Sequence, residues 1–286
     1  MVRSILVTAL VAGFAAKASG QAMDLDHARL SGLRPAQPLA TCNSAESDYA
    51  PAYDPLTRTL VFTSERGGTA CVYRCAMNSE GAAQRVAGTF NCDGEQRAFV
   101  ALTDAGDGVG VAYATYDAQA YAGIVTVPRE GADLNMGHAI TAINGPFFVS
   151  HPAIAPDGSR IVFASTRPGG EGGVDLWVSE LREDRTWSVP VNLGSTVNTG
   201  DDEITPSFAS ADTLLYATNG QGGLGGFDIF MTVYRNGAWQ EPLPLDWLNS
   251  EFDDSDGIIL PDGSYVFAST RPGGAGGLDL WIMRKP

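Results

Sequence analysis

The chain has 286 residues, of which 18% are charged and 34 are glycine, a composition typical of a folded globular protein rather than of a disordered or coiled-coil one. Its formal net charge is −15, from 18 Lys and Arg residues against 33 Asp and Glu residues. Because a phosphate backbone would be repelled by this charge, and no basic stripe interrupts it, nucleic acid is excluded as a partner.

The first 22 residues have the pattern of a secretory signal peptide. Arg3 precedes an apolar run over residues 5–16, and small residues offer cleavage sites after Ala18 or Ala22. The run is too short for an ordinary membrane span, and no cysteine follows either cleavage site to carry a lipid. We therefore expect residues 23–286 to be one exported domain, periplasmic or secreted, without a membrane span. The alternative is a leader that is retained as an anchor.

Four cysteines lie in the N-terminal third and suit two disulfides in an exported protein: Cys42, Cys71, Cys75 and Cys92. Cys71 and Cys75 fall on one predicted strand, about 13 Å apart, which is too far for a direct bridge unless the strand is broken. Each is therefore expected to pair with Cys42 or Cys92, and the connectivity stays open. Zinc is the competing interpretation, but a C-x₃-C spacing with no nearby histidine matches structural zinc sites poorly.

A repeat of about 50 residues dominates the sequence. The segment FASTRPGGEGGVDLW, residues 163–177, returns almost unchanged at residues 267–281, and YATNGQGGLGGFDIF lies between them at residues 216–230. The aromatic residue that opens each copy marks five repeats: Phe62, Tyr113, Phe163, Tyr216 and Phe267. An upstream asparagine marks the same five repeats: Asn43, Asn91, Asn144, Asn198 and Asn249.

Each copy predicts four short strands and no helix. In the third copy the strands fall at residues 152–155, 160–164, 174–178 and 187–193, separated by a Pro-Asp-Gly turn, a Gly-rich turn and a polar loop. Four-stranded units at this period predict an all-β, five-bladed β-propeller. The last copy stops after its third strand, so we expect the N-terminal segment at about residues 27–41 to supply the missing strand and close the last blade.

Residues 197–230, VNTGDDEITPSFASADTLLYATNGQGGLGGFDIF, resemble the WD40-like (PD40) repeat of TolB-type periplasmic propellers and OmpA-family proteins. The third and fifth copies also carry its PDG and GGxGGxDLW parts, whereas the second copy keeps only the hydrophobic skeleton. The resemblance implies an exported propeller that serves as a binding platform in the bacterial envelope. Because the peptidoglycan-binding domain of the OmpA family and the extra N-terminal domain of TolB are missing, a Tol-Pal role is not expected.

Two charged positions recur in the repeats. An acid follows the marker asparagine by five residues, and an arginine follows the marker aromatic by four: Asp48, Glu203 and Asp254, and Arg66, Arg167 and Arg271. We predict an inter-blade ring of charge-assisted hydrogen bonds, with Arg167 reaching Glu203, Arg271 reaching Asp48 and Arg66 reaching Glu95. In the fourth copy Asn219 replaces the arginine as the donor to Asp254. The arginine of the second copy would pair with the acid of the third. The second copy has Asp117 in the arginine position and the third has Val149 in the acid position, so both partners of this pair are missing together.

The aspartate of the GGxDLW segment also recurs, at Asp175, Asp228 and Asp279. We expect it to accept hydrogen bonds from the backbone of the glycine turn before it. The aromatic residues two positions later, Trp177, Phe230 and Trp281, are expected in the core between blades.

Candidates for chemistry are few. His151 enters a predicted inner strand, but a single histidine without companions is a weak metal signal. Calcium in the segment Asp253–Gly257 is chemically reasonable, although the downstream glutamate of an EF-hand loop is missing, and no other cofactor is expected. An alternative function is glycan binding or glycoside hydrolysis by carboxylates at the central funnel. Its candidates are Asp48, Asp202, Glu203, Asp253 and Asp254.

The repeated positions of these acids favour a structural role instead. We therefore expect a non-enzymatic binding scaffold that uses the loop-rich face carrying the strand-one entries and the Gly-rich turns. That face is acidic, so the expected partner is an envelope protein or peptide with cationic side chains.

Overall fold

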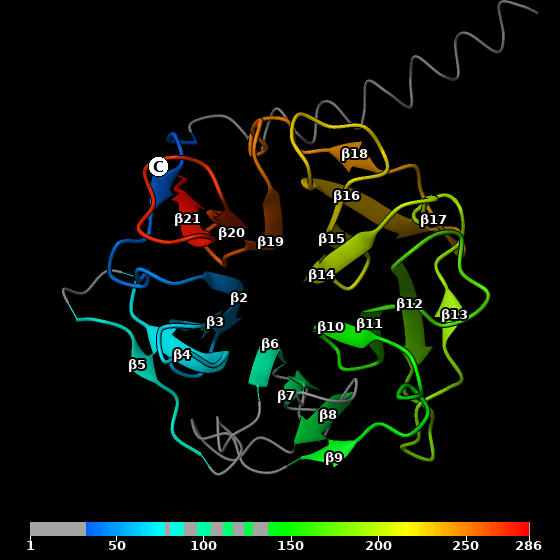
Figure 1. The fold of residues 1–286 in the computed structure, drawn as a ribbon. Coiled ribbons are helices and arrows are strands. Elements are labelled where there is room, and N and C mark those ends of the chain that lie inside the picture. The colour runs from blue at the N-terminus through cyan, green and yellow to red at the C-terminus, as the bar shows by residue number, and fades with distance from the viewer. Residues whose placement is uncertain are drawn as a thin grey trace, which may run out of the picture.

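The computed structural model describes residues 33–77, 81–88, 96–103, 111–116, 123–127 and 137–285. In this part of the chain the regular elements are all strands, and they form small antiparallel sheets around a central axis (Figure 1). The predicted all-β propeller arrangement is confirmed. No helix that could span a membrane is found among the described residues. The predicted signal peptide lies outside them.

Each repeat folds into one sheet whose first strand is innermost (Figure 1). The first sheet contains β2 (Asp48–Asp54), β3 (Thr59–Ser64), β4 (Cys71–Cys75) and β5 (Gln84–Arg85). The second contains β6 (Gln96–Leu102), β7 (Val111–Tyr116), β8 (Ile124–Val127) and β9 (His138–Ala139). The third contains β10 (Val149–Ile154), β11 (Arg160–Ser165), β12 (Asp175–Glu180) and β13 (Val191–Asn192).

The fourth sheet has one strand more than predicted. It contains β14 (Glu203–Ser210), β15 (Thr213–Thr218), β16 (Asp228–Arg235), β17 (Ala238–Trp239) and β18 (Leu243–Pro244). Both β17 and β18 pair with β16, where the sequence predicts a single outer strand. The outer segment is divided because Pro242, which lies between the two short strands, has no backbone N–H to donate to a ladder.

The N-terminal segment completes the last sheet, as the sequence predicts. This sheet contains β19 (Asp254–Ile259), β20 (Tyr265–Ser269), β21 (Asp279–Met283) and β1 (Gln37–Pro38). β1 pairs antiparallel with β21, with Gln37 opposite Ile282 and Pro38 opposite Trp281. The innermost strands of adjacent sheets are in contact, and contacts between β19 and β2 join the last sheet to the first.

The core lies between adjacent sheets. The marker aromatics Phe62, Phe163, Tyr216 and Phe267 are fully buried. Trp177, Phe230 and Trp281 are also buried, as predicted. In one such layer Leu176 and Val162 of the third sheet pack against Leu214 and Tyr216 of the fourth.

The marker asparagines join each sheet to the one before it. The amide oxygen of Asn198 accepts the backbone N–H of Leu176 at 2.8 Å, and its amide nitrogen donates to the carbonyl of the same residue at 3.0 Å. Asn43, Asn144 and Asn249 make the same pair of bonds to Leu280, Ile124 and Ile229. An amide side chain can do this because, like a peptide group, it carries both a carbonyl acceptor and an N–H donor. The repeated asparagine is therefore a one-residue extension of the preceding sheet. Asn91 lies outside the described residues.

A disulfide joins Cys42, in the turn after β1, to Cys75 at the end of β4, with 5.5 Å between the Cα atoms. Cys71 is also disulfide-bonded, and Cys92 lies outside the described residues. The zinc interpretation of these cysteines is therefore wrong. The Cys42–Cys75 bond ties the segment that completes the last sheet to the first sheet.

Candidate functional site

The repeated acids Asp48 and Asp254 are fully buried at the start of β2 and β19. Each accepts two bonds from the serine four residues earlier, through its backbone N–H and its hydroxyl. For Asp254 these bonds from Ser250 measure 2.6 and 2.7 Å. Ser44 makes the same bonds to Asp48, at 2.5 and 2.8 Å. The carboxylates thus fix the turn that leads into each innermost strand.

The arginine that pairs with each of these acids belongs to the same sheet. Arg66 Nη2 lies 2.7 Å from Asp48 Oδ1, and Arg271 Nη2 lies 2.5 Å from Asp254 Oδ1. The predicted inter-blade pairing of Arg271 with Asp48 is therefore wrong.

The strand register explains the pairing within one sheet. Asp254 lies directly opposite Ser269, two residues before Arg271, and Asp48 bears the same relation to Ser64 and Arg66. The guanidinium turns back over the serine, with Arg271 Nε donating to Ser269 Oγ at 2.9 Å. From there it reaches the acid of its own innermost strand.

The third and fourth sheets each lack one partner of this pair. Val149 leaves Arg167 without a carboxylate, so its guanidinium donates to the carbonyl of Ile143 at 2.6 Å and lies over the rings of Phe163 and Trp177 at 4.7 and 5.3 Å. Burial lowers the pKa of Arg167 to about 10, so it stays charged at neutral pH. The predicted bond from Arg167 to Glu203 is not formed.

Glu203 is instead held by hydroxyl groups of its own sheet. Thr199 donates its backbone N–H at 2.9 Å and its hydroxyl at 2.7 Å, and the Thr218 hydroxyl donates at 2.8 Å. Desolvation raises the pKa of this carboxyl. Gln221 takes the place of the missing arginine and donates to the carbonyl of Val197 at 2.8 Å. Sequence comparison missed Gln221 because it lies one position beyond the repeated arginine.

Hydrogen bonds between sheets are made one residue earlier, by the acid that precedes the repeated one. Asp202 Oδ1 accepts the backbone N–H of Val174 at 2.8 Å, and Asp253 Oδ1 accepts that of Phe227 at 3.0 Å. Asp254 does not receive the predicted bond from Asn219, whose side chain accepts the backbone N–H of Asp202 at 3.0 Å. Carboxylate-to-backbone bonds of this kind therefore join adjacent sheets in addition to the bonds of the marker asparagines, and the described residues form no ring of ion pairs between the sheets.

The aspartates of the GGxD segments lie under the turns that precede them. Asp175 accepts backbone N–H groups of Glu171 and Gly172 at 2.9 and 3.3 Å. Asp279 accepts those of Ala275 and Gly276, and Asp228 accepts that of Gly225. A Cβ on Gly170 would lie 1.6 Å from the Asp175 carboxylate, which explains the glycine there. Burial raises the pKa of Asp175 and of Asp228.

The carboxylates of the predicted calcium segment do not converge. Asp253 bonds to Phe227, Asp254 pairs with Arg271, and Asp256 lies in a cavity on the axis. Among the residues that the structure describes, no group of three His, Cys, Asp or Glu side chains could hold a metal ion.

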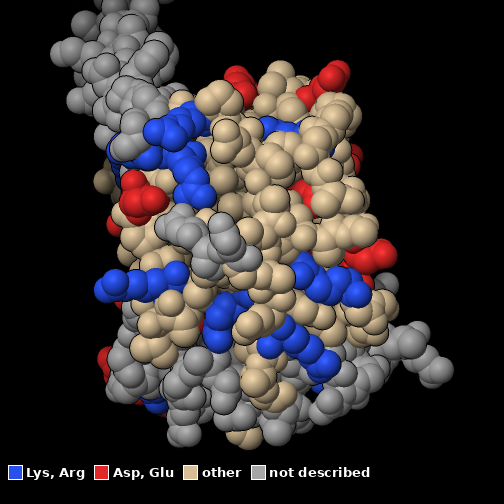
Figure 2. Space-filling model, turned by 90° about the vertical axis from the view of Figure 1, so that its left-hand side faces the viewer, with Lys and Arg blue, Asp and Glu red and all other residues tan. Residues whose placement is uncertain are grey.

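The Gly-rich turn of one sheet packs on the entry to the next innermost strand, and together these loops form one surface, the strand-entry face. A Cβ on Gly225 would lie 2.0 Å from the carbonyl oxygen of Phe252, and one on Gly276 would lie 2.1 Å from that of Glu46. The exposed charged side chains described on this face are acidic: Glu46, Glu171, Asp201, Glu251 and Asp253. Its two partly exposed cations, Arg66 and Arg271, are paired with buried acids. Lys and Arg side chains gather instead on the side shown in Figure 2.

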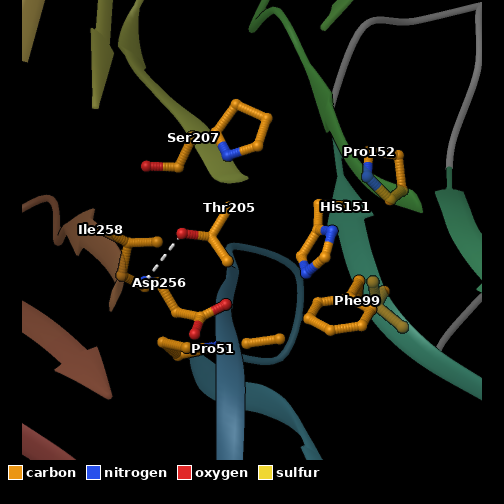
Figure 3. Close-up of a pocket in the computed structure, with 11 residues that line it drawn as sticks. Pro51, Phe99, His151, Pro152, Thr205, Ser207, Asp256 and Ile258 are labelled. Atoms are coloured by element: carbon orange, nitrogen blue, oxygen red, sulfur yellow. Dashed lines mark hydrogen bonds between the residues drawn. The ribbon is translucent and has the colours of Figure 1, made fainter. Parts of the chain in front are cut away.

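The axis of the propeller carries a feature that sequence comparison missed. Every innermost strand has a bulge, and one residue at each bulge has a left-handed backbone: Ala50, Phe99, His151, Thr205 and Asp256, with φ between 49° and 56°. A positive φ is uncommon for residues other than glycine, and bulges redirect side chains. All five residues line one cavity of ≈ 40 Å³ (Figure 3).

Two of these side chains are titratable and point into the cavity from opposite sides (Figure 3). Burial lowers the pKa of His151 to about 3 and raises that of Asp256 to about 6. The imidazole packs on Phe99, with 3.8 Å between ring centroids, and its buried Nδ1 atom has no hydrogen-bond partner. Asp256 donates its backbone N–H to the Thr205 hydroxyl at 3.1 Å.

A wider cavity of ≈ 170 Å³ continues from this one toward the turns between the first and second strands. The two cavities share Pro51, Val100, Pro152, Pro206, Ser207 and Ile258. The side chains that line the channel therefore include polar ones at the bulges, and beyond them the lining residues are mostly of hydrophobic type.

Comparison with known proteins supports the fold. No protein-family model and no curated protein matches the chain. Among solved structures, the endo-arabinase from Bacteroides thetaiotaomicron VPI-5482 is similar with a TM-score of 0.57 and 15% identity, over 86% of this chain and 95% of that one. The gluconolactonase XC5397 from Xanthomonas campestris has a TM-score of 0.52 and 15% identity, over 91% and 92%. A TolB candidate from Agrobacterium tumefaciens has a TM-score of 0.49 and 15% identity, over 84% and 83%. At these identities the similarity shows the fold alone.

Proposed function

We propose that the chain is a non-enzymatic, exported binding scaffold of the bacterial envelope, built as a five-bladed propeller, whose partner is a protein or peptide segment with cationic side chains. The observation that carries the proposal is the charge of the strand-entry face. Among the described residues its exposed charged side chains are acidic, and its partly exposed arginines, Arg66 and Arg271, are already paired with buried aspartates. Such a face attracts a cationic partner over several ångströms and repels an anionic one.

Export is supported by two independent features. The first 22 residues have the charge and hydropathy of a leader, and the chain carries a disulfide between Cys42 and Cys75. Disulfides persist in oxidising compartments and are rare in the cytosol.

Three of the five candidate acids of the glycoside-hydrolase alternative are buried, and the other two, Asp202 and Asp253, accept backbone N–H groups of the preceding sheet. Hydrolysis requires two carboxyl groups that face the substrate from about 5 to 9.5 Å apart. Asp48, Glu203 and Asp254 are instead fully buried and hydrogen-bonded within their own sheets. We therefore infer no substrate for this chain from its similarity to the arabinase and the gluconolactonase.

The test is retention of envelope proteins on residues 23–286 in the oxidised form. Partner binding should weaken as salt rises, because salt screens exposed charges. It should also weaken in a variant with Glu171→Gln, Asp201→Asn and Glu251→Gln, which removes three of the five exposed acids named on the strand-entry face. A matched control with Glu183→Gln and Asp184→Asn, in the exposed turn between β12 and β13, should bind like the original protein.

Binding that responds neither to salt nor to the first variant would refute the cationic partner. Hydrolysis of a panel of chromogenic and polymeric glycosides would refute the non-enzymatic role.

A further inference from the structure

The cavity on the axis is rich in hydrogen-bond acceptors, and its described lining includes no cationic side chain. Its polar side chains are His151, Thr205, Ser207 and Asp256. Among the described residues that line it, none is Lys or Arg, and no ion pair is formed by Asp256. A carboxylate is rarely buried without a positive partner, because its transfer from water is costly.

The hydrogen bonds within the cavity leave several acceptors available. Asp256 Oδ2 accepts the Ser255 hydroxyl at 2.6 Å, and no described group donates to Oδ1. The Thr205 oxygen accepts one backbone N–H, and a hydroxyl oxygen has a second lone pair. His151 has no side-chain hydrogen bond among the described residues, and its neutral ring offers one nitrogen lone pair. Three acceptors from three different sheets thus face one small volume.

We propose that this cavity binds a primary ammonium group carried on an unbranched apolar chain. An ammonium has three N–H donors, which match the carboxylate, the imidazole nitrogen and the threonine hydroxyl. A volume of ≈ 40 Å³ accommodates a group of this size, since a cavity needs about 10–15 Å³ to hold one water molecule. A guanidinium, which is planar with five donors in a fixed fork, matches these three acceptors less well.

The wider cavity beyond the bulges suits the rest of such a ligand. Its ≈ 170 Å³ are lined by Pro, Val, Leu, Ile, Ala and aromatic side chains, with Ser207 at the boundary. Methylene groups would gain hydrophobic stabilisation there, whereas the ammonium head lies between His151 and Asp256. A divalent metal ion is a poorer match, because the described cavity offers only two strong ligands and protein metal sites ordinarily supply three or more.

The ammonium group has two natural sources, a small alkylamine and a lysine side chain. We would titrate the mature protein, in a buffer without amines, with n-butylamine, with n-butanol and with Nα-acetyl-lysine amide, and measure affinity by isothermal calorimetry. The proposal predicts saturable binding of an amine with a 1:1 stoichiometry, and at least tenfold weaker binding of the neutral alcohol. Binding of the lysine derivative would identify the side chain as a source, and binding of butylamine alone would identify a small molecule.

Two variants separate the cavity from general charge attraction. Asp256→Asn should weaken amine binding at least tenfold. Asp212→Asn, which removes an exposed acid in the turn between β14 and β15, should leave binding unchanged. Folding of each variant is checked by its thermal unfolding.

The affinity should also fall as the pH is lowered from 8 to 5, because protonation of Asp256 removes the negative charge. His151 is the other titratable group lining the cavity, and the facing residues of β2, β6 and β14 do not titrate. Equal binding of amine and alcohol, equal effects of Asp256→Asn and Asp212→Asn, or displacement of the amine by stoichiometric Zn²⁺ would overturn the proposal. The proposal is independent of the partner on the strand-entry face, so either can fail alone.

Discussion

The substitution Asp256→Asn should stabilise the protein at pH 8, although it removes a buried charged group from the centre of the propeller. Burial raises the pKa of Asp256 from 3.8 to about 6. The folded state therefore binds the proton of the Asp256 carboxyl more tightly than the unfolded state does. The protonated carboxyl contributes fully to the free energy of unfolding below about pH 4, and this contribution is lost as the pH rises through 6. The difference between the two pKa values corresponds to about 3 kcal/mol at pH 8.

Asparagine suits the position in two other respects. Its amide oxygen can accept the Ser255 hydroxyl that Asp256 accepts at 2.6 Å. Asparagine also tolerates the left-handed backbone of this bulge, where φ is 55°, better than most residues do. The stability change is therefore expected to come from the charge alone.

The measurement is urea unfolding of the original protein and the variant at pH 4 and pH 8, in buffers without amines. We expect the variant to be more stable by up to about 3 kcal/mol at pH 8 and nearly equal at pH 4. Asp254→Asn is the matched control, because Asp254 is buried as well but is paired with Arg271 at 2.5 Å. It should destabilise the protein at pH 8. A loss of stability in Asp256→Asn at pH 8, or a difference that does not change with pH, would refute the reasoning.

Three further experiments test other parts of the structure. His151→Asn should make the protein less sensitive to acid. Burial lowers the pKa of His151 from 6.5 to about 3, so the original protein loses stability as the pH drops below 6.5. By pH 4 this loss should reach about 3 kcal/mol in urea unfolding, and the variant should not show it. A double-mutant cycle of Arg271→Ala with Asp254→Asn should show a coupling energy of about 2 kcal/mol. A cycle of Arg271→Ala with Asp48→Asn should show less than about 0.5 kcal/mol. A larger coupling energy with Asp48 than with Asp254 would indicate that the arginine pairs between sheets. Gly225→Ala places a Cβ 2.0 Å from a backbone carbonyl oxygen of the next sheet, so the midpoint of urea unfolding should fall by the equivalent of about 1–3 kcal/mol.

The architecture could be predicted from the sequence because the same residue types recur at the core positions and at the positions that bond one sheet to the preceding one. Phe62, Phe163 and Phe267 fill equivalent buried positions, and Asn198 and Asn249 make equivalent bonds to the preceding sheet. A position that needs one particular side chain recurs as that side chain, so the spacing of identical residues reveals it. The strand that β1 adds to the last sheet was predictable for the same reason, since the last copy lacked it.

The partners of the repeated charges could not be predicted from the same spacing. Arg271 follows its own Asp254 and precedes no later repeat, and repetition alone does not distinguish pairing within a sheet from pairing with the next one. The strand register decides, because Asp254 lies opposite Ser269 and the arginine turns back over that serine. Register depends on the bulge between Ser255 and Ile258, which shifts the pairing along the innermost strand. No residue type in the sequence marks that bulge.

The bulges also explain why the cavity on the axis was not predicted. The backbone at these five positions repeats, yet the residues are Ala50, Phe99, His151, Thr205 and Asp256, which share no side-chain property. The left-handed conformation is imposed by the bulge rather than by glycine, so composition gives no signal. Only the side chains differ around the axis, and they place one imidazole and one carboxyl in an otherwise uncharged ring. A ligand with a single directional head group can use such an asymmetric site. The sheets determine where that site lies, and the side chains that do not repeat determine what it can bind.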